Sequence, residues 1–238
     1  KTEITLKCEL TKEQEDLYET ILNALKKGIR TSSGQKDRLN MLSTLLKLRQ
    51  VTSHPRLLKE CKNMDLPSAK FDLLKEKLTE LTSKNHKIVV FSQFTSMLDI
   101  IQEWTKEQNI TTERIDGSVS GKQRQERVER FQSLSGSAVF IISLKAGGVG
   151  INLTSADYVI HLEPWWNPAI ESQATDRVHR MGQKNKVIVY KFIAKGTLEE
   201  KIQDLQEEKK ALITQIIDID SITENKINLK DIQELILS

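Results

Sequence analysis

Residues 138–153 read AVFIISLKAGGVGINL, and this stretch combines two patterns. The first five residues form an unbroken apolar run, which is typical of a β-strand that is buried on both faces of a sheet. Three of the seven residues after Ser143 are glycines. Because glycine lacks a side chain, a ligand can approach the backbone of such a turn, and successive amides can bind an anion. The stretch therefore predicts a strand followed by a candidate ligand loop. A turn that binds nothing is the alternative.

Strand and helix patterns alternate on both sides of this stretch. The sequence predicts strands at 88–91, 111–115, 138–142, 158–162 and 187–193, and helices with apolar stripes at 71–81, 97–104 and 121–132. This alternation predicts an α/β fold, in which helices cover both faces of a parallel sheet. We expect the strand at 187–193 to form one edge of that sheet.

Helical segments flank the predicted sheet. Leucines and isoleucines at helical spacing between residues 11 and 60, with a break at 31–34, predict a helical hairpin that projects from the main body. A long amphipathic helix is predicted at 197–217, packed on the core or the hairpin, and a short helix at 229–237. The predicted domains are a linker with the helical protrusion at 1–66, the sheet-containing lobe at 67–196, and a C-terminal brace helix with a tail at 197–238.

Composition excludes several classes of protein. The 238 residues are 38% hydrophobic and 29% charged, which is typical of a folded globular chain. No apolar run is long enough to cross a membrane, and the two cysteines fit neither a disulfide framework nor a zinc site, so we expect no metal site. The sequence begins at Lys1 without an initiator methionine or a signal peptide, so we expect a piece of a longer intracellular protein.

Positive charge is concentrated in one part of the chain. The net charge is +3, but residues 26–62 contain ten Lys or Arg against two acidic residues, a local net charge of +8. Such a window favours a polyanion or an acidic surface as partner, and a solvated basic face is the alternative.

Two arginines are candidates for phosphate chemistry. A helix predicted at 168–180 places Gln173, Arg177 and Arg180 on one arc, beside the arc that is buried. Planar guanidinium groups suit phosphate oxygens, and a pair of them at a cleft can neutralise the charge that develops in phosphoryl transfer. The alternative is that they are surface arginines paired with acidic residues of the same helix.

Two adjacent tryptophans, Trp165 and Trp166, lie between prolines in a polar loop. Exposing both rings to water is unfavourable unless a surface covers them. One interpretation is that both tryptophans are packing anchors. The other is that one of the two rings stacks on a ligand or on a partner domain.

The sequence lacks the usual residues for holding a nucleoside triphosphate. It contains no G-x-x-x-x-G-K-[ST] loop for the phosphates and no Asp-Glu pair for magnesium. We therefore expect this chain by itself not to hydrolyse a nucleotide.

Several segments resemble the motifs of one family. Residues 143–153, SLKAGGVGINL, and 173–183, QATDRVHRMGQ, closely resemble the fifth and sixth motifs of the SWI/SNF-type helicase-like ATPases, which are superfamily two DNA translocases. Residues 89–94, VVFSQF, resemble the fourth motif, and IDGS at 115–118 resembles the motif that follows it. LRQVTSHP at 48–55 is similar to the helical protrusion of this group. The resemblance implies the second RecA-like lobe, the C-terminal helicase domain.

The resemblance also implies a function. The full-length protein would be an ATP-dependent double-stranded DNA translocase or remodeller, with ATP and Mg²⁺ bound between two RecA-like lobes. The first lobe of the same protein would carry the phosphate loop and the acidic pair, so this fragment alone would be inactive. The implied partners are double-stranded DNA, that first lobe and a DNA-bound protein target, with no membrane. The implied location is intracellular: the cytoplasmic nucleoid in a prokaryote or the nucleus in a eukaryote.

By the same resemblance, individual residues receive roles. Arg177 and Arg180 match the arginine fingers that complete the ATP site. The nucleotide-facing positions are Gly148, Gly150, Asn152, Gln173 and Asp176, and the DNA-facing positions are Gln93, Gly117, Ser118, Ser143, Lys145 and Trp166.

Two other functions stay open. One is an RNA-directed helicase built on the same lobe, against which the protrusion and the Gln-x-x-Asp-Arg form of motif six argue. The other is a non-catalytic module whose basic window binds nucleic acid or an acidic protein tail.

Overall fold

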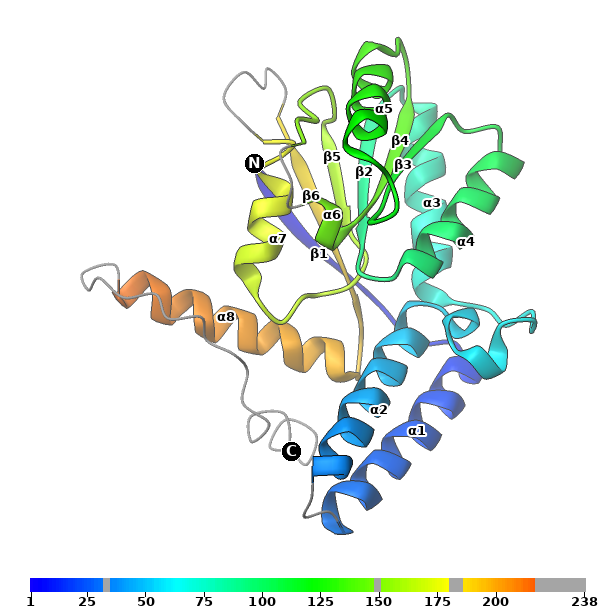
Figure 1. Cartoon of the computed structure of the whole chain (residues 1–238), viewed down its shortest axis with the longest axis vertical. Coiled ribbons are helices and arrows are strands. Elements are labelled where there is room, and N and C mark those ends of the chain that lie inside the picture. The colour runs from blue at the N-terminus through cyan, green and yellow to red at the C-terminus, as the bar shows by residue number, and fades with distance from the viewer. Residues whose placement is uncertain (32–34, 148–150, 180–185, 217–238) are drawn as a thin grey trace. The chain divides into compact units, whose positions relative to one another are not determined.

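The computed structural model describes residues 1–31, 35–147, 151–179 and 186–216 (Figure 1). The chain forms two compact units. The sheet unit comprises Lys1–Cys8, Ala69–Pro164 and Ala169–Ile193, and the helical unit comprises Glu9–Ser68, Trp165–Pro168 and Ala194–Ser238. The predicted ranges were 1–66, 67–196 and 197–238. In the structure the first eight residues group with the sheet, and the tryptophan loop and the brace group with the hairpin.

The sheet unit contains a six-stranded parallel sheet, which confirms the predicted α/β fold. The strand order is β1-β6-β5-β2-β4-β3. The strands are β1 (Thr2–Cys8), β2 (Lys87–Ser92), β3 (Thr112–Ile115), β4 (Ala138–Ser143), β5 (Tyr158–His161) and β6 (Ile188–Ala194).

Helices cover both faces of this sheet, as predicted. The helices α3 (Ala69–Ser83) and α4 (Thr95–Glu107) lie on one face, and α5 (Gly121–Ser133) and α7 (Pro168–Thr175) lie on the other (Figure 1). Every residue of β4 is buried as a result. This double cover explains why the central strands are continuous apolar runs.

The prediction of an edge strand at 187–193 is wrong, because β1 pairs outside β6. The amide of Thr2 donates to the carbonyl oxygen of Val187 over 2.9 Å. The segment that forms β1 contains two large aliphatic residues, Ile4 and Leu6, and no residue of the strand is fully buried. An edge strand needs few apolar side chains, so its sequence signal is weak.

Local sequence signals set where several helices begin and end. The α5 helix begins with a capping box, in which the Ser120 hydroxyl accepts from the Gln123 amide and the Gln123 side chain accepts from the Ser120 amide. Asn85 and Asn109 follow the ends of α3 and α4 with positive φ angles of 67° and 57°. Asparagine tolerates this left-handed conformation, which reverses the chain into the next strand.

The α7 helix ends at Thr175, five residues before the predicted end. The next residues form a tight turn, in which the amide of Val178 donates to the carbonyl oxygen of Thr175. The amide of Leu153 donates to the carbonyl oxygen of Arg177 over 2.9 Å. This long-range hydrogen bond replaces the bond that a further helical turn would make. Arg177 therefore lies beyond the helix, and Arg180 lies outside the described residues.

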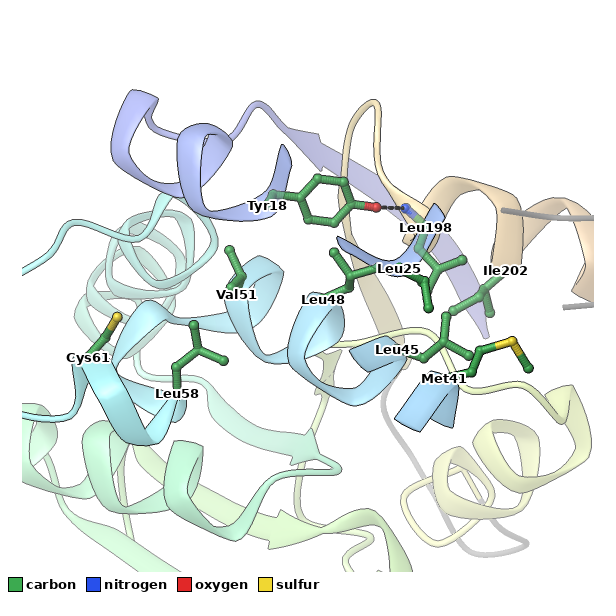
Figure 2. Packing of buried hydrophobic residues seen from close by; sticks show 10 residues of the cluster. All are labelled: Tyr18, Leu25, Met41, Leu45, Leu48, Val51, Leu58, Cys61, Leu198 and Ile202. Carbon is green, nitrogen blue, oxygen red and sulfur yellow. Dashed lines mark hydrogen bonds between the residues drawn. The ribbon is translucent and has the colours of Figure 1, made fainter. Parts of the chain in front are cut away.

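The helical unit contains the predicted hairpin and the brace helix. The hairpin helices are α1 (Lys12–Thr31) and α2 (Gln35–Ser53), the brace is α8 (Leu198–Ile216), and short 3₁₀ helices span Pro55–Leu57 and Lys59–Cys61. Their apolar side chains share one core (Figure 2), made of Tyr18, Leu25, Met41, Leu45, Leu48, Val51, Leu58, Cys61, Leu198 and Ile202. The brace therefore packs on the hairpin. The short helix predicted at 229–237 lies outside the described residues.

Buried polar groups fix the start of the brace within this core. The Tyr18 hydroxyl accepts a 2.7 Å hydrogen bond from the amide of Leu198 (Figure 2). The Glu199 carboxylate accepts from the Thr52 hydroxyl of α2 and from the amide of Ala194, each over 2.8 Å. These bonds satisfy orphan groups at the helix start, and a carboxylate there is favoured by the helix dipole.

None of the helices within the described ranges combines the length and the apolar character that a membrane span needs.

The Tyr18 hydrogen bond can be tested by stability measurements. Burial raises the pKa of Tyr18 to about 12, so its hydroxyl stays neutral. We expect Tyr18→Phe to lower the free energy of unfolding by about 1–2 kcal/mol, because the buried Leu198 amide loses its acceptor. Tyr158→Phe is the control, since its hydroxyl bonds to none of the described residues. Urea denaturation followed by circular dichroism measures both losses, and equal losses would contradict the assignment.

Candidate functional site

Four neighbouring strands of the sheet, in the order β5-β2-β4-β3, end at the same edge because they are parallel. Ser92, which ends β2, lies opposite Ser143, which ends β4. Loops that leave this carboxyl edge are the usual ligand-binding segments of such sheets. Five of the six predicted DNA-facing positions lie at or just after these strand ends: Gln93, Gly117, Ser118, Ser143 and Lys145.

These five residues differ in how far they reach solvent. Gly117, Ser118 and Lys145 are exposed, whereas Ser143 is buried. Gln93 is half-buried, and its Nε2 atom has no hydrogen-bond partner among the described residues. A buried amide donor without a partner is costly, so a ligand oxygen that reached Gln93 would gain a strong contact.

A buried carboxylate organises the centre of the edge. Glu163 follows β5 and is 5% exposed. Its two carboxylate oxygens each lie 3.1 Å from the Ser92 hydroxyl, and one accepts from the Gln93 amide over 3.0 Å. Glu163 thus fixes the backbone of Gln93. Its role was missed from the sequence, although an acidic residue directly after a buried strand was an available signal.

A second carboxylate shapes the turn after β3. Asp116 accepts from both the amide and the hydroxyl of Ser118, and from the guanidinium of Arg114. The hydrogen bond from the Ser118 hydroxyl holds the pKa of Asp116 below its usual value, and Arg114 adds to this effect. Both Ser118 donors are therefore engaged. The exposed backbone at Gly117 is the more accessible position for a phosphate, because a Cβ there would meet no atom within 4 Å.

The part of the fifth-motif loop around Asn152 and the segment with Arg177 form a separate group. The hydrogen bond from Leu153 to the Arg177 carbonyl joins the fifth-motif loop to the sixth-motif segment. Gln132 holds the same loop, since its Nε2 donates to the Asn152 carbonyl over 3.2 Å and its Oε1 accepts from the Ser155 amide over 2.8 Å. Gln132 lies near the end of α5, on the side of the sheet where β4 begins. This group is thus distinct from the carboxyl edge.

Not all of the nucleotide-facing predictions can be located. Asn152, Gln173 and Asp176 are exposed, and Arg177 is half-buried. Three further predicted residues, Gly148, Gly150 and Arg180, lie outside the described residues. Within α7, the buried Glu171 carboxylate lies 3.4 Å from the Lys191 ammonium, which identifies one ion pair of this helix.

A buried histidine anchors the end of α7. The Nε2 atom of His161 lies 2.9 Å from the Thr175 hydroxyl, and the ring stacks on Phe91 at 5.2 Å. Burial lowers the pKa of His161 to about 4, so the imidazole is neutral near pH 7. Because Thr175 ends α7, this contact fixes the chain two residues before Arg177.

The tryptophan loop belongs to the helical unit. Trp166 is half-buried and packs against the apolar core, which supports the role of packing anchor. The Arg49 guanidinium lies over both rings, 5.5 Å from the centroids of Trp165 and Trp166. The DNA contact assigned to Trp166 stays a prediction.

Within the described ranges, no three His, Cys, Asp or Glu side chains group as a metal site requires.

Comparisons with known proteins identify the family. The model of the helicase conserved C-terminal domain matches residues 69–182. The structure of the Sulfolobus solfataricus SWI2/SNF2 ATPase C-terminal domain is 38% identical, with a TM-score of 0.75, over 91% of this chain and 90% of that chain. The chain belongs to the SWI2/SNF2 ATPase family. It is the C-terminal lobe, which confirms both the resemblance and the RecA-like fold.

Several relatives are longer than this chain, which spans only part of their length. The S. solfataricus SWI2/SNF2 ATPase core in complex with dsDNA is 40% identical over 91% of this chain and 46% of that chain, with a TM-score of 0.76. An "Uncharacterized ATP-dependent helicase" of Mycoplasma pneumoniae is 42% identical over 182 residues. The aligned region covers 76% of this chain and 17% of that relative.

The buried His161 predicts a pH dependence of stability. The pKa of His161 is about 4 in the folded lobe and about 6.5 when unfolded. Between pH 6.5 and pH 4, the unfolded chain therefore binds a proton at His161 that the folded chain does not bind. Stability is therefore complete above pH 6.5 and falls as the pH drops towards 4, by roughly 3 kcal/mol from this group. We expect His161→Gln to remove this part of the pH dependence.

Urea denaturation between pH 7 and pH 4 measures the effect. His179→Gln serves as the control, because His179 is exposed. Parallel pH profiles for the wild type and His161→Gln would show that His161 is not the responsible group.

Proposed function

We propose that the full-length protein is an ATP-dependent translocase of double-stranded DNA, in which this lobe supplies arginine groups to the ATP site and contacts to the DNA backbone. Family membership supports the ATP-dependent part. The observation that carries the proposal is the arrangement of the sheet unit. The DNA-facing positions follow adjacent strand ends, and a separate hydrogen bond joins the fifth-motif loop to Arg177. A lobe with two such groups can couple nucleotide turnover to DNA contact.

Hydrolysis would need a second lobe. This sequence contains neither a phosphate loop nor an Asp-Glu pair, so the first lobe of the same protein would hold most of the ATP and its Mg²⁺. Closure of the lobes would bring Arg177 and Arg180 to the γ-phosphate, where their guanidinium groups neutralise developing charge. Asn152, Gln173 and Asp176, with the glycines of the loop, would line this lobe's side of the pocket.

Contacts to DNA would be made through phosphates. Lys145 supplies an exposed charge, Gly117 an accessible backbone, and Gln93 a buried amide whose backbone is fixed by Glu163. Phosphate contacts of this kind carry no sequence information and weaken with salt. The related S. solfataricus core was solved in complex with dsDNA, which supports duplex DNA as the substrate. The protein would then act inside the cell, on DNA that carries a bound protein target.

Replacing the arginines tests the ATP site. We expect Arg177→Ala or Arg180→Ala in the full-length protein to reduce kcat for ATP by about a thousandfold, because the charge of the transition state is no longer neutralised. The affinity for duplex DNA should change little. Arg130→Ala is the control, since Arg130 has an exposed side chain on α5 and pairs with Glu113 of β3. Normal turnover in both arginine variants would overturn the assignment.

Changes at the carboxyl edge test the DNA site. We expect Lys145→Ala to weaken DNA binding and to reduce the slope of log K against log salt by about one. Gly117→Ala should weaken binding without loss of stability, because the added methyl group has space in the free lobe but hinders a phosphate. Lys106→Ala is the control, since Lys106 lies in the last turn of α4, at the opposite edge.

Fluorescence anisotropy with a labelled duplex measures these affinities and their salt dependence. Unchanged binding in both edge variants would place the DNA site elsewhere. Comparing the stimulation of ATP turnover by duplex DNA and by RNA tests the RNA-directed alternative, and the absence of any turnover would favour a binding module.

A further inference from the structure

The loop Trp165–Pro168 belongs to the helical unit, although its flanking segments belong to the sheet unit. The chain leaves the sheet unit after Pro164 and returns to it at Ala169, in the first turn of α7. The α7 helix carries Gln173 and leads directly to Arg177. A change in the position of this loop therefore acts on the segment that carries the sixth motif.

Arg49 is the central contact of the loop within the helical unit. It lies on α2 and is 5% exposed, and its guanidinium lies 5.5 Å from the ring centroids of both Trp165 and Trp166. Cation–π contacts strengthen when they are removed from water. A planar guanidinium can lie flat against a ring, whereas an ammonium acts as a point charge. One side chain thus holds two adjacent rings.

Other contacts attach the loop to the brace helix. Gln206 of α8 donates from Nε2 to the backbone carbonyl of Trp165. Trp166 packs against the apolar core, as does Leu205 of the same helix. The loop is therefore held from α2 and from α8, both of which belong to the helical unit.

We propose that Arg49 is a positioning residue for the sixth motif: through the two tryptophans it holds the loop that leads directly into α7, the helix that carries Gln173 and precedes Arg177. The inference rests on the proposed ATP-dependent function. Arg49 is buried and contacts the tryptophans, so in this proposal it acts on the ATP site through them and does not touch the nucleotide itself. Arg49 then becomes one of the residues that set the rate of ATP turnover.

The loop is well suited to transmit position. It is four residues long, and prolines at 164 and 168 restrict the backbone at both of its ends. A displacement of the tryptophans should therefore also displace the start of α7, because the short, restricted backbone between them cannot adjust. Misplacing a reacting group by about 1 Å can cost up to a hundredfold in rate. Loss of Arg49 should consequently appear in kcat rather than in substrate binding.

The test uses the full-length protein and steady-state ATP turnover with saturating duplex DNA. We expect Arg49→Met, which keeps the length of the side chain, to lower the DNA-stimulated kcat by about tenfold. KM for ATP and the affinity for DNA should stay within about twofold. The kcat of Arg49→Lys should lie between those of the wild type and Arg49→Met, because lysine keeps the charge and loses the planar group. Lys47→Met is the matched control, since Lys47 lies on the same helix with an exposed side chain.

Tryptophan fluorescence reports on the loop directly. The emission is measured on full-length protein in which every tryptophan other than Trp165 and Trp166, Trp104 included, is replaced by phenylalanine, so that only the pair at Arg49 emits. We expect the emission of this pair to change when a non-hydrolysable ATP analogue and DNA are added, and Arg49→Met to abolish that change. A purely structural role would lower the unfolding temperature and leave kcat and the emission change intact.

The outcomes separate the two proposals. A wild-type protein without DNA-stimulated turnover would refute the proposed function, whatever Arg49 does. An active wild type with Arg49→Met at the same kcat would overturn this inference alone. Should Arg49→Met fail to fold, Arg49→Lys decides by the same comparison: a reduced kcat supports the positioning role, and an unchanged kcat refutes it.

Discussion

The parallel pairing of β2 with β4 and β5 is the constraint on which the rest of the sheet unit depends. Because Ser92 lies opposite Ser143, the loops that follow these strands start side by side. This arrangement needs strands that are buried on both faces, which the apolar runs supply. It also places Glu163 beside Ser92, where a buried carboxylate is tolerated only because hydroxyl and amide donors surround it. The geometry of the edge thus follows from packing.

The helical unit depends on a different constraint, which is the satisfaction of buried polar groups. The apolar core alone would allow α8 to slide or rotate on the hairpin, since hydrophobic contacts are not directional. The bonds of Tyr18 with Leu198 and of Thr52 with Glu199 fix the register of the first turn of α8. On α1, the Gln14 side chain donates to the Val51 carbonyl over 2.8 Å and fixes the hairpin in the same way. Each of these groups would be costly if left without its partner.

The sequence predicted the elements that carry strong local signals. The central strands were predicted from apolar runs, the hairpin from helical spacing, and most of the edge residues from motifs. What the sequence did not reveal depends on distant contacts. The amide of Leu153 bonds to the carbonyl of Arg177 just beyond α7, and β1 pairs with β6. The tryptophan loop contacts Arg49, which lies more than 100 residues earlier in the sequence. Glu163 follows a predicted buried strand, but its partners Ser92 and Gln93 lie 71 and 70 residues earlier, so its role depends on distant contacts.

The loop that follows β4 connects the two groups of candidate residues. It begins at Ser143, in the register of the carboxyl edge, and reaches Leu153, whose amide is bonded to Arg177. Both ends of the loop are held by the fold, since the β4 ladder fixes the first end and Gln132 fixes the region around Asn152. The predicted DNA-facing Ser143 and the predicted nucleotide-facing Asn152 are therefore each held by contacts of the sheet unit, nine residues apart in the sequence. In the proposed function, the DNA site and the ATP site would thus be linked by a short stretch of sequence, and coupling between them would need no long pathway through the core.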